Sequence, residues 1–121
     1  LVSMTETGEK GFKKISETIN SLRKNPPETL ANDDLIKIYD YKESLLTDKL
    51  NNVSSILNFP KSNLLIFESS NGTKVAVRPS GTEPKIKYYF SVNTNLDKKN
   101  DFKIKDELLN KKINLLIEQF I

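Results

Sequence analysis

The stretch that decides the fold runs from residue 63 to residue 90 and reads "NLLIFESSNGTKVAVRPSGTEPKIKYYF". It contains three apolar runs, and the first two flank Asn71 and Gly72. Asn-Gly readily takes the positive φ angles of a two-residue type I′ turn, so the sequence predicts a hairpin of two antiparallel strands. In the predicted register Ile66 lies opposite Val77. Both faces of this hairpin are partly apolar, so the pattern leaves open which face belongs to the core.

The third apolar run, residues 85–93 ("KIKYYFSVN"), alternates between apolar and polar positions as a half-buried strand does. One face carries Ile86, Tyr88, Phe90 and Val92. The other face carries Lys85, Lys87, Tyr89 and Ser91. The sequence therefore predicts that a strand follows the hairpin, with its aromatic face against the core.

Amphipathic helices are predicted near both ends of the chain. The first covers residues 8–24, and Asn25–Pro27 ends it because proline cannot continue a helix. Its apolar side carries Phe12, Ile15, Ile19 and Leu22. The second helix is predicted over residues 101–120. Its apolar side carries Leu109, Ile113, Leu116 and Phe120.

One more strand is predicted between the first helix and the hairpin. Residues 35–41 ("LIKIYDY") gather β-branched and aromatic side chains, as strands do. Residues 42–63 are polar and rich in turn formers, so we expect an irregular connection there. The resulting order of helix, strand, hairpin, strand and helix favours an α+β fold, in which a four-stranded antiparallel sheet packs against helices.

The composition suits a single globular domain over residues 1–121 and excludes several kinds of site. The absence of cysteine and histidine removes disulfides, thiolate catalysis and the usual general base near neutral pH. The 19 basic and 16 acidic residues leave a net charge of +3, too small to indicate nucleic-acid binding by itself. No apolar run approaches the roughly 20 residues that span a bilayer, and no signal peptide is recognisable, so we expect a cytoplasmic protein. Because the chain opens on Leu1 and its one methionine is Met4, we expect a part of a longer protein.

The segment between the second and third apolar runs concentrates groups that bind anions. Arg78 offers a fork of donors suited to phosphate, and Ser80 and Thr82 add hydroxyl donors. Gly81 allows a backbone N–H to approach an anion closely. Lys87, on the following strand, can add a second cation. Together these residues predict a site for a phosphate dianion that needs no metal.

The same segment also fits a plain turn. Pro79, Gly81 and Pro84 are turn formers, and the hydroxyls of Ser80 and Thr82 can bond to the local backbone. The spacing is not that of a P-loop, because no Gly-Lys-Ser/Thr opens a helix. From the residue types alone, both interpretations stay open.

The motif "RPSGTEPKIKYY", residues 78–89, resembles the phosphate-binding loop in the last domain of the α-D-phosphohexomutases, the phosphoglucomutase and phosphomannomutase superfamily. The surrounding "FPKSNLLIF" and "VAVRPSGTEPKIKYYF" are similar to the bacterial phosphoglucomutase-type branch, as is "GFKKISETINSLRKNPP" upstream. The resemblance implies a C-terminal, fourth domain over residues 1–121. It also implies a TATA-box-binding-protein-like fold, in which a four-stranded antiparallel sheet packs against helices.

The resemblance further implies a role, in which the domain closes over a cleft and holds the phosphate of the sugar that is not reacting. The family's phosphate contacts match Arg78, Ser80, Gly81 and Thr82. Lys87 lies where relatives often carry arginine, so it is expected to be a further contact. Glu83 is expected to brace the loop rather than to touch phosphate.

The groups that carry out the family's chemistry do not occur in this chain. It lacks the Thr-Ala-Ser-His-Asn-like loop of the phosphorylated serine, the Asp-Gly-Asp-like magnesium run and the sugar-recognition loop. The resemblance implies a parent enzyme that uses Mg²⁺ and a hexose 1,6-bisphosphate activator, while this chain alone holds no cofactor and is inactive. The expected partners are a phosphosugar and the remaining mutase domains, with no nucleic acid and no membrane. Asp33 and Asp34 are more typical of a solvated turn than of a metal site.

Two other functions stay open from the sequence. A single-stranded nucleic-acid or general anion-binding module is suggested by Tyr88, Tyr89 and Phe90 beside lysines. Against it, Tyr88 and Phe90 share the predicted core face, which leaves Tyr89 alone with the lysines. A structural domain that has lost its ligand also fits the fold, although the intact loop motif argues against it.

Overall fold

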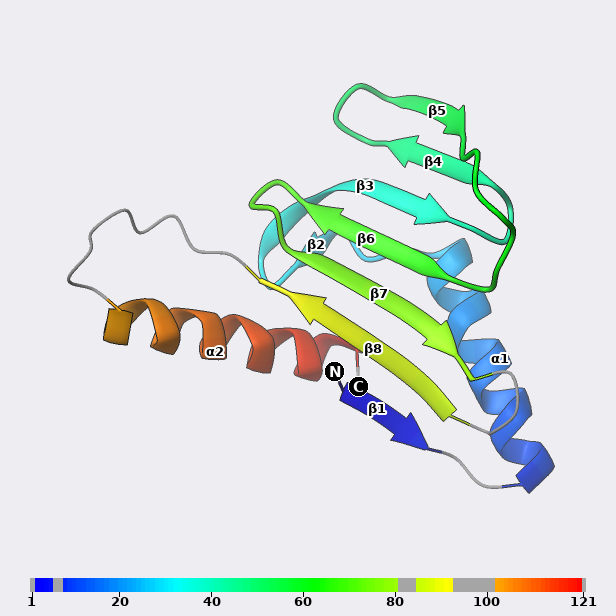
Figure 1. Cartoon of the computed structure of the whole chain (residues 1–121), viewed down its shortest axis with the longest axis horizontal. Coiled ribbons are helices and arrows are strands. Elements are labelled where there is room, and N and C mark those ends of the chain that lie inside the picture. The colour runs from blue at the N-terminus through cyan, green and yellow to red at the C-terminus, as the bar shows by residue number, and fades with distance from the viewer. Residues whose placement is uncertain (1, 6–7, 81–84, 93–101, 121) are drawn as a thin grey trace.

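The computed structural model describes residues 2–5, 8–80, 85–92 and 102–120. The described strands are β1 (Val2–Thr5), β2 (Thr29–Leu30), β3 (Asp33–Asp40), β4 (Leu45–Asp48), β5 (Val53–Ile56), β6 (Leu65–Ser69), β7 (Lys74–Pro79) and β8 (Lys85–Ser91). The described helices are α1 (Gly8–Lys24) and α2 (Phe102–Phe120). Seven strands pair in the order β1-β8-β7-β6-β3-β4-β5, and β2 pairs with β3 beside this path (Figure 1). Every pairing is antiparallel.

The α+β class is confirmed, and the predicted number of strands is wrong. Both predicted helices are present, since α1 covers residues 8–24 and α2 begins one residue after the predicted start. The predicted strands correspond to β3, β6, β7 and β8. The sheet is wider than four strands because β1 adds to β8 at one edge, and β4 and β5 add to β3 at the other. The finer likeness to the TATA-box-binding protein stays a prediction.

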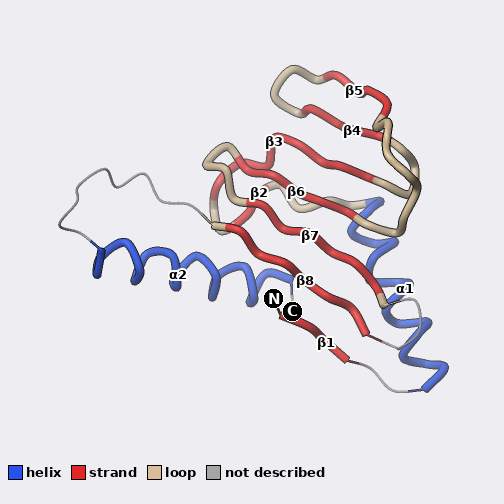
Figure 2. The backbone as a smooth tube through the Cα atoms, viewed as in Figure 1, coloured by secondary structure: helices blue, strands red, loops and turns tan. Residues whose placement is uncertain are grey.

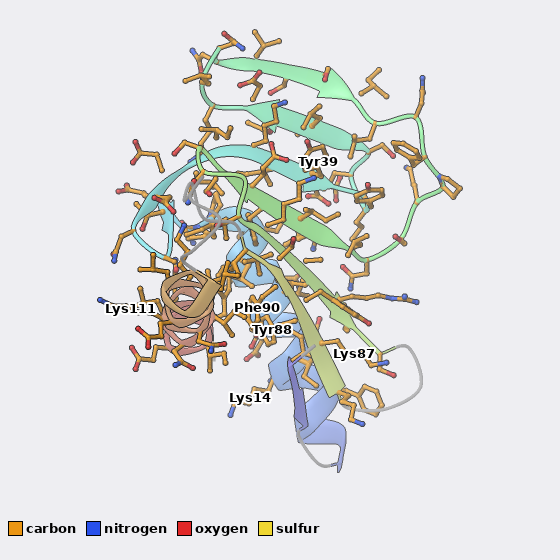
Figure 3. The ribbon with its side chains drawn as sticks, turned by 60° about the vertical axis from the view of Figure 1, so that its left-hand side comes forward. Lys14, Tyr39, Lys87, Tyr88, Phe90 and Lys111 are labelled. Carbon is orange, nitrogen blue, oxygen red and sulfur yellow. The ribbon has the colours of Figure 1, made fainter. Side chains whose placement is uncertain are left out.

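The two helices cover one face of the sheet. Fully buried side chains reach this face from the neighbouring strands β6, β7 and β8, and they are Leu65, Phe67, Val75, Val77, Ile86 and Tyr88. Ile15 and Ile19 of α1 and Leu116 of α2 belong to the same core cluster, as do Leu30, Ala31 and Leu35. Figure 3 shows Tyr88 and Phe90 on the side of β8 toward α2 and Lys87 on the other side, as the alternation of β8 predicts.

The register of the β6–β7 hairpin differs from the predicted one by one residue. Ile66 lies opposite Ala76, whereas Val77 lies opposite Leu65. This pairing places Phe67 on the helix-covered face and Ile66 on the open face, so the core face of the hairpin is now defined.

The turn itself explains the shift in register. Gly72 has a φ of 79°, but Asn71 does not have the positive φ that a type I′ turn requires. The Gly72 N–H donates to the Ser69 carbonyl at 3.0 Å, and the Ser69 N–H donates to the Thr73 carbonyl at 2.8 Å. The loop is therefore a three-residue connection with a left-handed glycine, and the predicted two-residue turn is wrong.

Residues 42–63, predicted to be irregular, contain the β4–β5 hairpin (Figure 2). Asp48 closes its turn, because its carboxylate accepts hydrogen bonds from the backbone N–H groups of Leu50 and Asn51 at 3.0 and 3.2 Å. The side-chain amide of Asn51 donates to Asp48 at 2.9 Å, and this bond is the largest cause that lowers the pKa of Asp48. β5 is exposed along its length, so backbone pairing and turn contacts form this hairpin without a buried apolar face.

β1 was not predicted either. It pairs with β8 in a register that sets Val2 opposite Tyr88 and Met4 opposite Ile86. β8, the last strand of the predicted sheet, is therefore an internal strand. Neither described helix is long and apolar enough to cross a membrane.

Tyr88 is a fully buried residue whose hydroxyl has no hydrogen-bond partner among the described residues. Its ring centroid lies 6.2 Å from that of Phe90 and 6.1 Å from that of Phe120. Burial raises the pKa of Tyr88 above the ordinary 10.0, because the phenolate is less stable away from water. We expect Tyr88→Phe to increase the free energy of unfolding by about 1 kcal/mol, since it removes an unsatisfied hydroxyl and keeps the ring contacts.

Urea unfolding followed by circular dichroism, at about pH 7 and about pH 11, measures this effect. The folded-state pKa of Tyr88 is raised, so its contribution to stability is complete below the unfolded pKa near 10 and is lost as pH rises above it. The phenylalanine variant should therefore lose less stability at alkaline pH than the unsubstituted chain. A variant less stable than the unsubstituted chain at neutral pH would show that the hydroxyl has a favourable partner.

Candidate phosphate-binding site

Arg78 and Lys87 lie directly opposite each other on β7 and β8. Both occupy positions that alternate with buried residues, so they belong to the sheet face that the helices leave open. Neither side chain forms an ion pair within the described part of the chain. Like charges directly opposite on neighbouring strands destabilise a sheet, and a bound anion relieves that repulsion. This pair is therefore suited to a negatively charged ligand.

Ser80 marks the start of the predicted phosphate loop. Its backbone N–H donates to the carbonyl of Lys85 at 2.7 Å, which joins the end of β7 to the start of β8. Because this N–H is already bonded, a ligand at Ser80 would contact the hydroxyl. Gly81, Thr82 and Glu83, also predicted to belong to the loop, lie outside the described residues.

A hollow of about 390 Å³ lies beside this loop, between α1 and the end of β7. Its lining includes Arg78 and Ser80 from the loop side, Ser62 and Asn63 from the segment before β6, and Phe12 from α1. The volume falls within the range of small-ligand sites, and most of these side chains carry hydrogen-bonding groups. The structure thus brings Arg78 and Ser80 to one hollow. Lys87 lies opposite Arg78 in the strand register but does not line the hollow.

The burial of Phe12 differs from what the sequence predicted. This residue was placed on the apolar side of the first helix with Ile15 and Ile19, which are indeed buried. Phe12, however, is 46% exposed and lines the hollow instead of joining the core. An exposed aromatic ring in the lining of the hollow offers an apolar surface to a ligand.

A network around Arg23 was missed by the sequence interpretation. Arg23 Nε donates to Asp40 Oδ2 at 2.9 Å, and Arg23 Nη2 donates to Asn63 Oδ1 at 3.0 Å. The other carboxylate oxygen of Asp40 accepts the backbone N–H groups of Lys42 and Glu43 at 3.1 and 3.2 Å. The network links the last turn of α1 to the end of β3 and to the edge of the hollow.

The acidic pair Asp33-Asp34 does not form a metal site within the described residues. Asp33 lies 3.6 Å from Lys112 of α2, which makes it an ion-pair partner between the sheet and that helix. Among the described residues, no group of three Asp, Glu, His or Cys side chains could hold a metal ion. The carboxylate of Asp33 therefore contacts both Lys112 of α2 and, through a hydrogen bond from the Asn71 side chain at 3.4 Å, the β6–β7 loop.

The aromatic residues of β8 lie on two different faces of the sheet, as the sequence predicted. Tyr88 is fully buried and Phe90 packs against the core cluster, whereas Tyr89 is 42% exposed on the open face. Tyr39 of β3 also belongs to the open face, but Ile66 and Ala76 separate it from Tyr89 in the same cross-strand row. Two aromatic rings on strands this far apart do not form a continuous platform for stacked bases.

The fold and these contacts define an α+β domain with a candidate anion-binding site at the β7–β8 connection. The chain is 39% identical over 94 residues to a phosphoglucomutase of Staphylococcus saprophyticus, an alignment that covers 77% of this chain and 17% of the relative. A phosphoglucomutase of Staphylococcus haemolyticus is 33% identical over 88 residues, 73% of this chain and 16% of the relative. One from Staphylococcus aureus is 39% identical over 92 residues, 76% of this chain and 16% of the relative.

The chain is therefore homologous to a portion of bacterial phosphoglucomutases and forms a domain related to them. It spans about one sixth of the length of the curated relatives that it matches. No family model and no solved structure matches the chain.

Proposed function

We propose that this chain is the phosphate-binding C-terminal domain of a phosphoglucomutase or phosphomannomutase. The observation that carries the proposal is the hollow shared by Arg78 and Ser80, in a chain homologous to phosphoglucomutases. Arg78 supplies a planar fork of donors for phosphate oxygens, and Lys87 adds positive charge from the neighbouring strand. Ser80 contributes its hydroxyl, and Gly81 and Thr82 complete the proposed phosphate contacts.

In the proposed parent enzyme, a hexose 1-phosphate and a hexose 6-phosphate interconvert through a phosphoserine and a bisphosphorylated sugar. A phosphoryl group passes from the serine to a free sugar hydroxyl, the bisphosphate reorients, and the serine takes back the other phosphoryl group. This domain holds the phosphate that is not reacting and closes the cleft. Binding energy from that remote phosphate then orients the reacting end of the sugar.

The phosphoserine, the magnesium ion and the hexose 1,6-bisphosphate site belong, in this proposal, to other parts of the longer protein. The described residues of this chain offer no group of three side chains that fits a metal ion. We also propose that the parent enzyme is cytoplasmic and that its catalytic serine lies elsewhere, and we expect the present chain alone to be inactive. Its partners are the phosphosugar and the other mutase domains.

Titration of the ¹⁵N-labelled chain with glucose 6-phosphate and inorganic phosphate tests this function. We expect backbone amide shifts concentrated at residues 78–87 for both phosphate compounds, and no comparable shifts for glucose, because phosphate is the group recognised. Sodium chloride at matched ionic strength controls for non-specific ionic effects. No shift in this segment at millimolar glucose 6-phosphate would contradict the proposed function.

A further inference from the structure

Asn63 lies at the edge of the hollow that Arg78 and Ser80 line, and a hydrogen bond from Arg23 orients its side chain. Arg23 Nη2 donates to Asn63 Oδ1 at 3.0 Å. A guanidinium only donates hydrogen bonds, so the atom facing Arg23 must be the amide oxygen of Asn63. The amide nitrogen therefore projects from the other end of the group. That nitrogen donates no hydrogen bond within the described part of the chain, so its two N–H groups can serve a ligand.

Arg23 is itself held in place by three hydrogen bonds to other side chains. Each of its three guanidinium nitrogens donates to a protein oxygen, namely Asp40 Oδ2 at 2.9 Å, Asn63 Oδ1 at 3.0 Å and Asn20 Oδ1 at 3.2 Å. The side chains of Arg23 and Asp40 are only 14% and 10% exposed. A partly buried, charge-assisted contact of this kind fixes geometry better than an exposed one. Arg23 is thus a positioning residue for Asn63.

The hollow also has an apolar side next to these donors. Phe12 of α1 is 46% exposed and lines the hollow, and Ser16 lies one turn further along the same helix. A sugar ring presents hydroxyl oxygens at its edge and C–H groups on its faces. An amide donor at one side and an aromatic ring at another therefore match a polyol better than they match a bare phosphate ion.

We infer that this hollow is a subsite for the sugar of a phosphosugar, with Asn63 Nδ2 donating to a sugar hydroxyl and Arg23 holding the Asn63 amide in position. The inference rests on the proposed function, since Arg78 and Ser80 hold the phosphate of the same ligand. It goes beyond that function because the domain then recognises the sugar as well as its phosphate. The affinity for a hexose phosphate should accordingly exceed the affinity for inorganic phosphate.

Dissociation constants of the full chain for glucose 6-phosphate and for inorganic phosphate, measured by amide shifts, test the inference. Asn63 is exposed, so Asn63→Ala should keep the fold, which circular dichroism checks. We expect Asn63→Ala to weaken glucose 6-phosphate binding about three- to tenfold and to leave inorganic phosphate binding unchanged. Asn58→Ala is the matched control, because Asn58 is an exposed asparagine of the same connection that does not line the hollow.

A double-mutant cycle tests the role of Arg23. Arg23→Lys keeps the positive charge beside Asp40 but loses the fork that also reaches Asn63. We expect Arg23→Lys to weaken the binding of glucose 6-phosphate but not that of inorganic phosphate. In the Asn63→Ala background, Arg23→Lys should have no further effect on glucose 6-phosphate binding. Effects that multiply in the double variant would show that Arg23 does not act through Asn63.

The outcomes separate this inference from the function on which it rests. Unchanged glucose 6-phosphate affinity in Asn63→Ala, or equal losses for both phosphate compounds, would overturn the sugar subsite and leave the phosphate site standing. Binding of neither compound by the unsubstituted chain would overturn both.

Discussion

Arg78→Ala should weaken binding of both glucose 6-phosphate and inorganic phosphate by about 10- to 100-fold. A hydrogen bond to a charged group contributes about 1.5–3 kcal/mol, and a bidentate arginine can make two of them to one phosphate. Lys87, directly opposite on β8, remains in the variant and would leave weak residual binding. The loss should be nearly equal for the two ligands, because Arg78 is proposed to contact the group that they share.

Lys111→Ala provides the charge-matched control for this prediction. It removes the same single positive charge from an exposed position on α2, on the other side of β8 from Lys87 (Figure 3). Arg78→Lys is the informative second variant, since lysine keeps the charge but not the planar fork. If Arg78→Ala and Lys111→Ala changed the dissociation constants equally, Arg78 would act only through the net charge, and its assigned contact would be wrong.

In a phosphoglucomutase that contains this domain, the same substitution should raise KM and also lower kcat. The remote phosphate is bound in both the ground state and the transition state, which accounts for the effect on KM. It also positions the reacting hydroxyl, which accounts for the effect on kcat. Kinetic constants within twofold of those of the unsubstituted enzyme would contradict this role.

Phe67→Ala should decrease the free energy of unfolding by about 3–5 kcal/mol. Phe67 is fully buried in β6, between Ile38 of β3 and Val75 of β7 in the sheet. Its ring stacks on Phe120 of α2, with 6.0 Å between the ring centroids. Truncation therefore removes a large apolar contact area and opens a cavity where the sheet meets α2. Since the free energy of unfolding of a native protein is about 5–15 kcal/mol, this loss is a large part of the total stability.

Phe59→Ala is the matched control, because it removes the same side chain from a position that is 61% exposed. Its ring contacts Tyr41 at a centroid distance of 5.9 Å, outside the main core, so we expect a loss below about 1 kcal/mol. Urea unfolding of both variants measures the difference. Equal losses would mean that the β6–α2 contact is not the centre of the core.

The elements that the sequence predicted well are those whose apolar residues recur with a clear period. Residues 8–24 form α1, in which Ile15 and Ile19 mark the buried face. Residues 85–91 form β8, in which Ile86 and Tyr88 mark the buried face. Asn71-Gly72 correctly predicted a hairpin, but the same pair suits turns of two and three residues. The register therefore depended on the φ angle of Asn71, which residue types do not determine.

The elements that the sequence missed are stabilised by pairing rather than by burial. Val53–Ile56 is exposed and half polar, so β5 carries no periodic signal, and its turn depends on side-chain bonds from Asp48 and Asn51. The turn-forming Asp48, Asn51 and Asn52 between two short apolar runs were the available signal. β1 pairs with β8, 80 to 86 residues away in the chain, and no local pattern reveals such a partner.

The residues of the candidate site also fall into two groups, those that the sequence indicated and those that it missed. Arg78 and Ser80 were found from the loop motif, because phosphate-binding chemistry is concentrated in a few neighbouring residues. Asn63 and Arg23 were not found, because their contact joins residues 40 positions apart and depends on how α1 packs against the sheet near β7. Neither residue type indicates a site by itself.

A crystal structure of the chain with glucose 6-phosphate is the most direct test of the central claim that the β7–β8 connection holds the phosphate of a phosphosugar. We expect the phosphate within hydrogen-bond distance of the Arg78 guanidinium and the Ser80 hydroxyl, with the sugar in the hollow beside Asn63 and Phe12. A phosphate bound elsewhere, with Arg78 and Ser80 unliganded at saturating glucose 6-phosphate, would contradict the account.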